Sequence, residues 1–156
     1  MRTVRTKVFK FEELSKEAKD NAIAQLAGIN VDSWDWWYSI DTDAKDVGIT
    51  RITFDTYRGD ISGSIPNVGD CINLILSSHG KDCETFKIAS EYQSLLLSAD
   101  TDELYDLEAN FKDAILAEYL KMLLSELEYL QTDEAIIATI VENEYEFTAD
   151  GNLFKS

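Results

Sequence analysis

The chain has 156 residues, of which 45% are hydrophobic and 11% aromatic, and it holds one proline, so its composition is that of a folded protein. Its 14 Lys and Arg against 30 Asp and Glu give a formal net charge of −16. This charge argues against direct binding to nucleic acid or to an anionic membrane, because both carry negative charge themselves. The apolar runs are far shorter than the roughly 20 residues of a membrane-spanning helix.

The negative charge is concentrated in the second part of the chain. Residues 1–90 carry 14 acids and 11 bases, a net −3, whereas residues 91–156 carry 16 acids and 3 bases, a net −13. We predict a single domain over 1–156 with an acidic, mainly helical C-terminal half from about residue 91. Such a half suits a basic partner, and solvation of the surface alone is the alternative.

Local signals define the first elements of the chain. Alternating β-branched and basic residues predict a strand over 3–9. Ser15 is the expected N-cap of a helix that ends at Gly28. A second helix is predicted over 32–48, where Gly48 provides the end.

The second predicted helix contains three tryptophans. Its apolar side chains fall within an arc of about 100°, so Trp36 and Trp37 are expected to pin the helix to a sheet. Trp34 and Tyr38 lie four residues apart at the flank of this arc. They are candidate anchors of a protein interface, because aromatic side chains are enriched at binding hot spots. Partial burial against the following hairpin is the alternative.

The middle and the end of the chain alternate strand and helix signals. Residues 49–65 predict a β-hairpin around the turn Arg58-Gly59-Asp60, and two short helices capped at Asp70 and Asp82 follow. Thr132 is expected to cap a helix before a terminal hairpin over 144–154. The fold class predicted is α+β, with a small antiparallel sheet of three to five strands packed against four to six helices.

The longest predicted helix begins at Thr101 or Asp102 and continues to residue 131. Its face opposite the apolar stripe is acidic and comprises Asp102, Asp106, Asp113 and Glu128. The first three carboxylates follow one another at about 6 and about 10 Å along the axis, so the face could occupy a basic nucleic-acid channel of another protein. A solvated helix face is the alternative.

No motif of the sequence carries a recognisable chemistry. The aspartate runs from Asp41 and Asp100 lack the glycine and the glutamate that a calcium loop requires at its sixth and twelfth positions. The single His79 and the two cysteines, Cys71 and Cys83, have no zinc-ligand spacing. We therefore expect no metal, no cofactor, no catalytic residue and no enzymatic activity. A small carboxylate-based enzyme is the alternative, which a pocket holding acids with perturbed pKa values would indicate.

The localisation expected is the cytoplasm. The N-terminal basic residues are followed by no apolar segment of the kind found in signal peptides. Cys71 and Cys83 are too few for a disulfide framework, and free thiols are typical of a reducing compartment.

Three segments of the chain carry a resemblance. They are VFKFEELSKEAKDNAIAQL, INVDSWDWWYSIDTDAKDVGITRITFDTYRG and TDEAIIATIVENEYEFTADGNLF. Together they resemble a family of small bacteriophage and prophage proteins, some of which carry an antitoxin-like label. The resemblance covers nearly the whole chain and is weakest over 66–130. It implies a phage gene product that acts in the host bacterial cytoplasm, and it supplies no catalytic residue.

The resemblance and the acidic half together suggest a function. The leading hypothesis is an inhibitor that binds a host protein with a basic surface, a defence nuclease complex, in the manner of an anti-CRISPR or anti-restriction protein that mimics the charge of nucleic acid. One alternative is an antitoxin that neutralises a basic toxin. Another is a dimeric structural or regulatory phage protein, in which the long helix pairs with its own copy.

Overall fold

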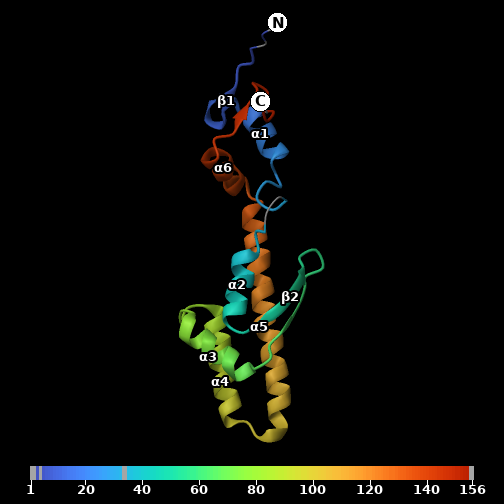
Figure 1. Cartoon of the computed structure of the whole chain (residues 1–156), viewed down its shortest axis with the longest axis vertical. Coiled ribbons are helices and arrows are strands. Elements are labelled where there is room, and N and C mark those ends of the chain that lie inside the picture. Colours follow the sequence, from blue (N-terminus) through green and yellow to red (C-terminus); the bar gives the residue numbers. More distant parts are fainter. Residues whose placement is uncertain (1–2, 4, 33–34, 155–156) are drawn as a thin grey trace. The chain divides into compact units, whose positions relative to one another are not determined.

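The computed structural model describes residues 3, 5–32 and 35–154 (Figure 1). Within these residues the fold is α+β, as expected, with six α-helices, one short 3-10 helix and four strands. The chain divides into two compact units, one formed by residues 1–36 and 127–156 and the other by residues 37–126. Each unit contains a hydrophobic cluster. That the two units form a single domain over 1–156 remains a prediction.

The second unit holds most of the helices. Its elements are α2 (Tyr38–Asp46), β2 (Thr50–Asp55), β3 (Asp60–Ser64), α3 (Val68–Ser78), α4 (Glu84–Ser98) and α5 (Thr101–Leu130) as far as residue 126. Phe111, Ile115 and Tyr119 follow one another at four-residue intervals on α5 and are fully buried. Isoleucines of the hairpin and of α3 surround them and complete the core.

The β-hairpin predicted over 49–65 is confirmed. β2 and β3 pair antiparallel, with Phe54 opposite Ile61 and Asp55 opposite Asp60. Side chains of β2 alternate between half-buried and exposed, which is the pattern of a strand with one face on a core. Gly59 has a φ of +73° in the connecting turn, a conformation that glycine adopts without steric cost.

The first unit combines the two ends of the chain. It contains β1 (Phe9–Lys10), the 3-10 helix η1 (Phe11–Glu13), α1 (Lys16–Gln25), α6 (Asp133–Glu142) and β4 (Glu146–Phe147). Ser15 and Thr132 cap α1 and α6 as predicted, because each hydroxyl accepts from the backbone N–H three residues on, at 3.2 Å. Phe11 and Phe147 meet edge to face in the core of this unit.

The prediction of a single sheet with three to five strands was wrong. The described strands form two separate two-stranded sheets, β1 with β4 and β2 with β3. Among the described residues of the strand predicted over 3–9, only Phe9 is in a strand, as part of β1, because residues 5–7 are polar and exposed and offer no apolar face to a sheet. β4 is equally short, although a bridge from Phe147 to Leu153 supports the predicted terminal turn.

Three helix starts differ from the prediction. α2 begins at Tyr38 and not near residue 32, and Trp36 and Trp37 lie in the preceding turn, both half-buried. The Trp37 ring packs on Phe54 of β2 at 6.3 Å between centroids, so Trp37 contacts a strand as expected, although from the turn before α2 and not from within a helix. α3 is capped by Asn67, which accepts from the Asp70 N–H at 2.9 Å, and α4 starts after Cys83.

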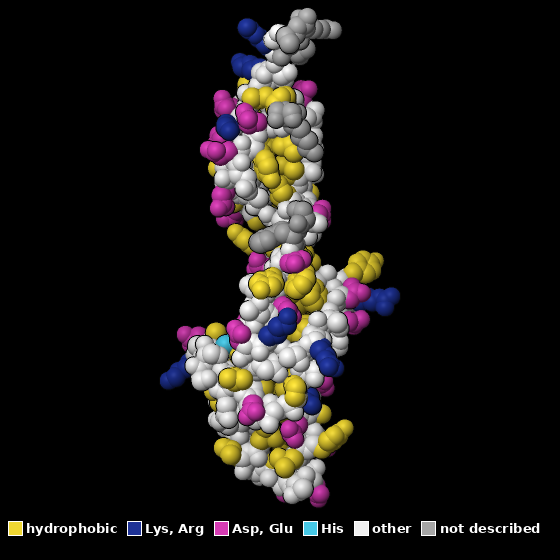
Figure 2. Space-filling model, viewed as in Figure 1, with side chains coloured by type: hydrophobic (Ala, Val, Ile, Leu, Met, Phe, Trp, Pro, Cys, Tyr) yellow, Lys and Arg dark blue, Asp and Glu magenta, His cyan; other side chains and the backbone are white. Residues whose placement is uncertain are grey.

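Acidic side chains lie on the face of both units that Figure 2 draws. None of the helices within the described residues is long and apolar enough to cross a membrane.

Candidate functional site

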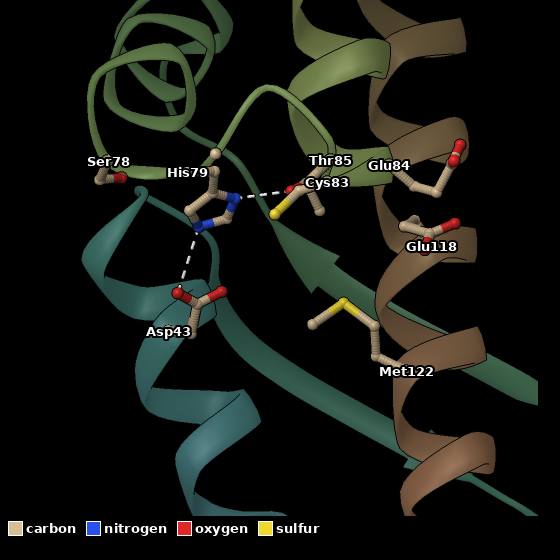
Figure 3. A pocket seen from close by; sticks show the side chains of 9 residues that line it. Asp43, Ser78, His79, Cys83, Glu84, Thr85, Glu118 and Met122 are labelled. Carbon is tan, nitrogen blue, oxygen red and sulfur yellow. Dashed lines mark hydrogen bonds and ion pairs between the residues drawn. The ribbon is translucent and has the colours of Figure 1, made fainter.

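His79 lies at the centre of a polar network in the second unit (Figure 3). It caps the C-terminal end of α3, and its side chain is 10% exposed. Its Nδ1 lies 2.6 Å from the Thr85 hydroxyl of α4, and its Nε2 lies 3.1 Å from Asp43 Oδ1 of α2. Nε2 and Asp43 share one hydrogen bond, and Nδ1 and the Thr85 hydroxyl share the other.

Tyr119 of α5 completes the network. Its hydroxyl donates to the second carboxylate oxygen of Asp43 at 2.7 Å. Burial raises the pKa of the Tyr119 phenol far above its ordinary value, and the hydrogen bond that the phenol donates to Asp43 and the charge of that carboxylate act in the same direction. The phenol is therefore a neutral donor at physiological pH. Four helices meet through four polar side chains here.

A pocket opens beside this network. It has a volume of about 490 Å³ and lies where α4 and α5 face the end of α3. His79 and Asp43 form one side, and Glu118 and Met122 of α5 form another. The exposed Cys83 also lines it. Two further polar groups, Ser78 and Glu84, stand at the rim in Figure 3.

The network limits the chemistry that the pocket can perform. Both ring nitrogens of His79 are hydrogen-bonded to protein groups, so the group from which His79 could take a proton is the Thr85 hydroxyl. In a catalytic triad of Thr85, His79 and Asp43, the hydroxyl of Thr85 would be the nucleophile. Thr85 is only 4% exposed, so a substrate cannot reach it. Within the described part of the chain, no three His, Cys, Asp or Glu side chains are grouped to hold a metal ion. The arrangement is a hydrogen-bond network that links α2, α4 and α5 to the C-terminal end of α3.

Sequence reasoning missed this network. By its spacing Tyr119 belongs to the apolar stripe of the long helix, and His79 is considered above only as a zinc ligand. One signal was present, because a tyrosine in a buried stripe needs a partner for its hydroxyl. Its partner Asp43 lies 76 residues away in the chain, and nothing in the sequence identifies it.

The acidic residues of α5 have a different setting. Asp102, Asp106 and Asp113 are all exposed. The ion pairs between described residues join other carboxylates, those of Asp41, Asp55, Glu84 and Asp43, so the three α5 carboxylates are in none of them. Glu128 is also exposed but belongs to the first unit. A surface shared by all four residues stays a prediction.

Of the two aromatic candidates, the structure describes Tyr38 alone. Tyr38 is the first residue of α2 and is 64% exposed, so its ring is available to a partner. Trp34 lies outside the described residues.

The chain matches no protein-family model, no curated protein and no solved structure.

Proposed function

We propose that this chain is a phage-encoded acidic protein that binds and inhibits a host protein acting on nucleic acid, in the manner of an anti-CRISPR or anti-restriction protein. It would act in the bacterial cytoplasm by binding alone, without a cofactor. The observation that carries the proposal is the set of exposed carboxylates on α5, Asp102, Asp106 and Asp113, which are unpaired among the described residues. The phage setting rests on the resemblance of the three segments quoted above.

The helix geometry brings these three carboxylates to one side. At 100° per residue, positions 102, 106 and 113 fall within an arc of about 40°, and the rise of about 1.5 Å per residue spaces them over about 16 Å. A row of fixed negative charges on a rigid helix presents to Lys and Arg side chains what a strand of phosphates presents. Such complementarity accelerates encounter and selects the partner.

The polar network supports a binding role over acid–base catalysis. A general base takes its proton from the substrate or from a nucleophile that the substrate can reach, and the Thr85 hydroxyl beside His79 belongs to a residue that is only 4% exposed. His79 has both nitrogens engaged, and Asp43 is hydrogen-bonded to His79 and to Tyr119. These groups hold the helices of the second unit in place, and α5 thereby presents its acidic side on a rigid scaffold.

The test is retention of host proteins by the tagged chain at about 0.1 M and about 0.5 M salt, between which the screening length falls about twofold. Three forms are compared, the wild type, the variant Asp102→Asn/Asp106→Asn/Asp113→Asn, and a matched control. The control neutralises three other exposed acids of the second unit and carries the same net charge: Asp46→Asn, Asp60→Asn and Asp82→Asn.

The proposal requires a nucleic-acid-acting protein that the wild type and the control retain at low salt. It also requires that the α5 variant loses this protein, and that a duplex substrate added to the lysate competes for it. Equal retention by the α5 variant and the control would contradict the mechanism. A retained basic toxin, released by the α5 variant, would favour the antitoxin alternative instead.

A further inference from the structure

The connection between α4 and α5 carries exposed apolar side chains. We call residues 95–106 the α4–α5 tip. Leu97, in the last turn of α4, is 82% exposed, and Tyr105, in the second turn of α5, is 81% exposed. Leu95 and Leu104 beside them are also exposed. Single exposed apolar residues are common on proteins, but several at one helix connection, two of them more than 80% exposed, make this connection a candidate interaction surface.

The fold does not use these side chains. Consecutive residues of a helix point about 100° apart, so the three leucines at 95–97 cannot all face inward. Leu96 packs against the core, whereas Leu95 and Leu97 point away from it. On α5 the buried stripe starts at Phe111, where Tyr92 of α4 meets it edge to face. The tip therefore extends beyond the core of its unit.

A shallow groove lies next to Leu97. It has a volume of about 220 Å³, and Ile72 of α3 and Leu96 and Leu97 of α4 supply its apolar walls. Gly69 of α3 leaves one side low, because it has no side chain. The groove is of the size to receive an apolar side chain, and the exposed Leu97 stands at its edge.

The charge around the tip has a single sign. Residues 88–111 contain no Lys, Arg or His and six acids, which are Glu91, Asp100, Asp102, Glu103, Asp106 and Glu108. The nearest base before this stretch, Lys87, is paired with Glu84. In Figure 2, acidic and hydrophobic side chains alternate at the end of the second unit where α4 joins α5. A partner that covers this surface must bring positive charge together with apolar side chains.

We infer that the α4–α5 tip is the docking site for a basic, apolar segment of a partner protein. Apolar side chains of that segment cover Leu97 and Tyr105, and its Lys and Arg side chains meet Asp102 and Asp106. The inference rests on the proposed function and deepens it by naming the kind of segment that is bound. A second copy of this chain fits poorly, because a two-fold contact through the tip would place acids opposite acids.

The test uses a fluorescent synthetic helical peptide with leucine on one face and lysine on the other, and the measurement is fluorescence anisotropy. Two further peptides carry serine in place of leucine, or glutamate in place of lysine. The full chain is compared with Leu97→Ser/Tyr105→Ser. The matched control, Tyr57→Ser/Val141→Ser, removes an exposed aromatic and an exposed aliphatic side chain elsewhere. Circular dichroism establishes that all three proteins are folded.

The leucine–lysine peptide should bind the wild type and the control, and the tip variant should bind it at least about tenfold more weakly. The serine–lysine and leucine–glutamate peptides should both bind the wild type more weakly than the leucine–lysine peptide. Equal binding of the leucine–lysine and serine–lysine peptides, or equal affinity of the tip variant and the control, would overturn the inference. So would a dimer in solution that Leu97→Ser/Tyr105→Ser dissociates.

The same tip variant separates this inference from the proposed function. If the host protein is lost from Asp102→Asn/Asp106→Asn/Asp113→Asn but kept by Leu97→Ser/Tyr105→Ser, the proposed function stands and the docking site is overturned. If the peptide binds in a Leu97- and Tyr105-dependent manner but no nucleic-acid-acting protein is retained, the docking site stands and the proposed function falls.

Discussion

At the scale of residues, the phenol of Tyr119 links α5 to α2 through Asp43. Tyr119→Phe removes the hydroxyl that donates to this carboxylate and leaves the ring packing unchanged. We expect a loss of about 1 kcal/mol in the free energy of unfolding, below the usual value for a hydrogen bond to a charged group. The loss is small because the Asp43 side chain is 41% exposed and can bind water instead.

Chemical denaturation of both proteins at neutral pH measures this loss. Tyr105→Phe is the control, because this tyrosine lies on the same helix with an exposed hydroxyl, and its removal should change the free energy of unfolding by less than about 0.5 kcal/mol. Equal effects of the two substitutions would show that the bond from Tyr119 to Asp43 contributes nothing to stability.

The two cysteines should differ in reactivity. Cys71 is fully buried, and burial raises the pKa of its thiol to about 11, whereas Cys83 is exposed. Because the thiolate is the reacting form, a thiol reagent near pH 8 should modify Cys83 in the native protein and Cys71 only after unfolding. The reagent releases a coloured group when it reacts with a thiol, so the increase in absorbance measures the rate of modification. Fast modification in the native state of the Cys83→Ala variant would contradict the burial of Cys71.

The raised pKa of Cys71 also has a consequence for stability. A group whose pKa is higher in the folded state stabilises the fold fully below its unfolded pKa, and this contribution is lost as pH rises. The free energy of unfolding should therefore decline between pH 9 and about pH 11. Cys71→Ala should flatten this decline relative to Cys83→Ala, whatever its cost at neutral pH. Parallel declines in the two variants would exclude Cys71 as a source.

At the scale of elements, the C-terminal turn packs tightly on α1. Gly151 is buried with a φ of +86°, and a Cβ there would collide with the carbonyl oxygen of Ala18. Gly151→Ala should therefore lower the free energy of unfolding by about 3 kcal/mol or more. Gly59→Ala is the control, because its φ is +73° but its Cβ would meet nothing within 4 Å, so only the backbone cost of about 1 kcal/mol applies. Chemical denaturation measures the free energy of unfolding of both variants. Equal losses in the two variants would contradict the close contact between Gly151 and Ala18.

At the scale of the whole molecule, the negative charge is largely uncompensated. The three pairs of a lysine or arginine with an acid in the described residues all involve residues before position 91, and the net charge is −16. Mutual repulsion of the acids should destabilise the folded chain at low salt. Raising NaCl from about 0.05 to about 0.5 M should increase the free energy of unfolding by about 1 kcal/mol. The increase should be smaller in Asp102→Asn/Asp106→Asn/Asp113→Asn, and its absence in the wild type would contradict this account.

The sequence by itself determined the features that depend on near neighbours. Ser15 and Thr132 bind backbone groups three residues away, so their capping could be predicted from a short window. The hairpin around Gly59 follows from alternation and a turn signal within 49–65. The buried stripe of α5 follows from four-residue spacing. The acidic character of the second half is a matter of counting side chains.

Only the tertiary structure decided how distant residues meet. The division into two two-stranded sheets and the late start of α2 depend on which surfaces find an apolar partner, as Trp37 does on Phe54. His79 and Tyr119 reach Asp43 across 36 and 76 residues of chain. The exposure of Leu97 and Tyr105 likewise depends on where the core ends. The physical reason is the same in each case, because burial is a property of three-dimensional packing and local periodicity indicates only which side of an element is apolar.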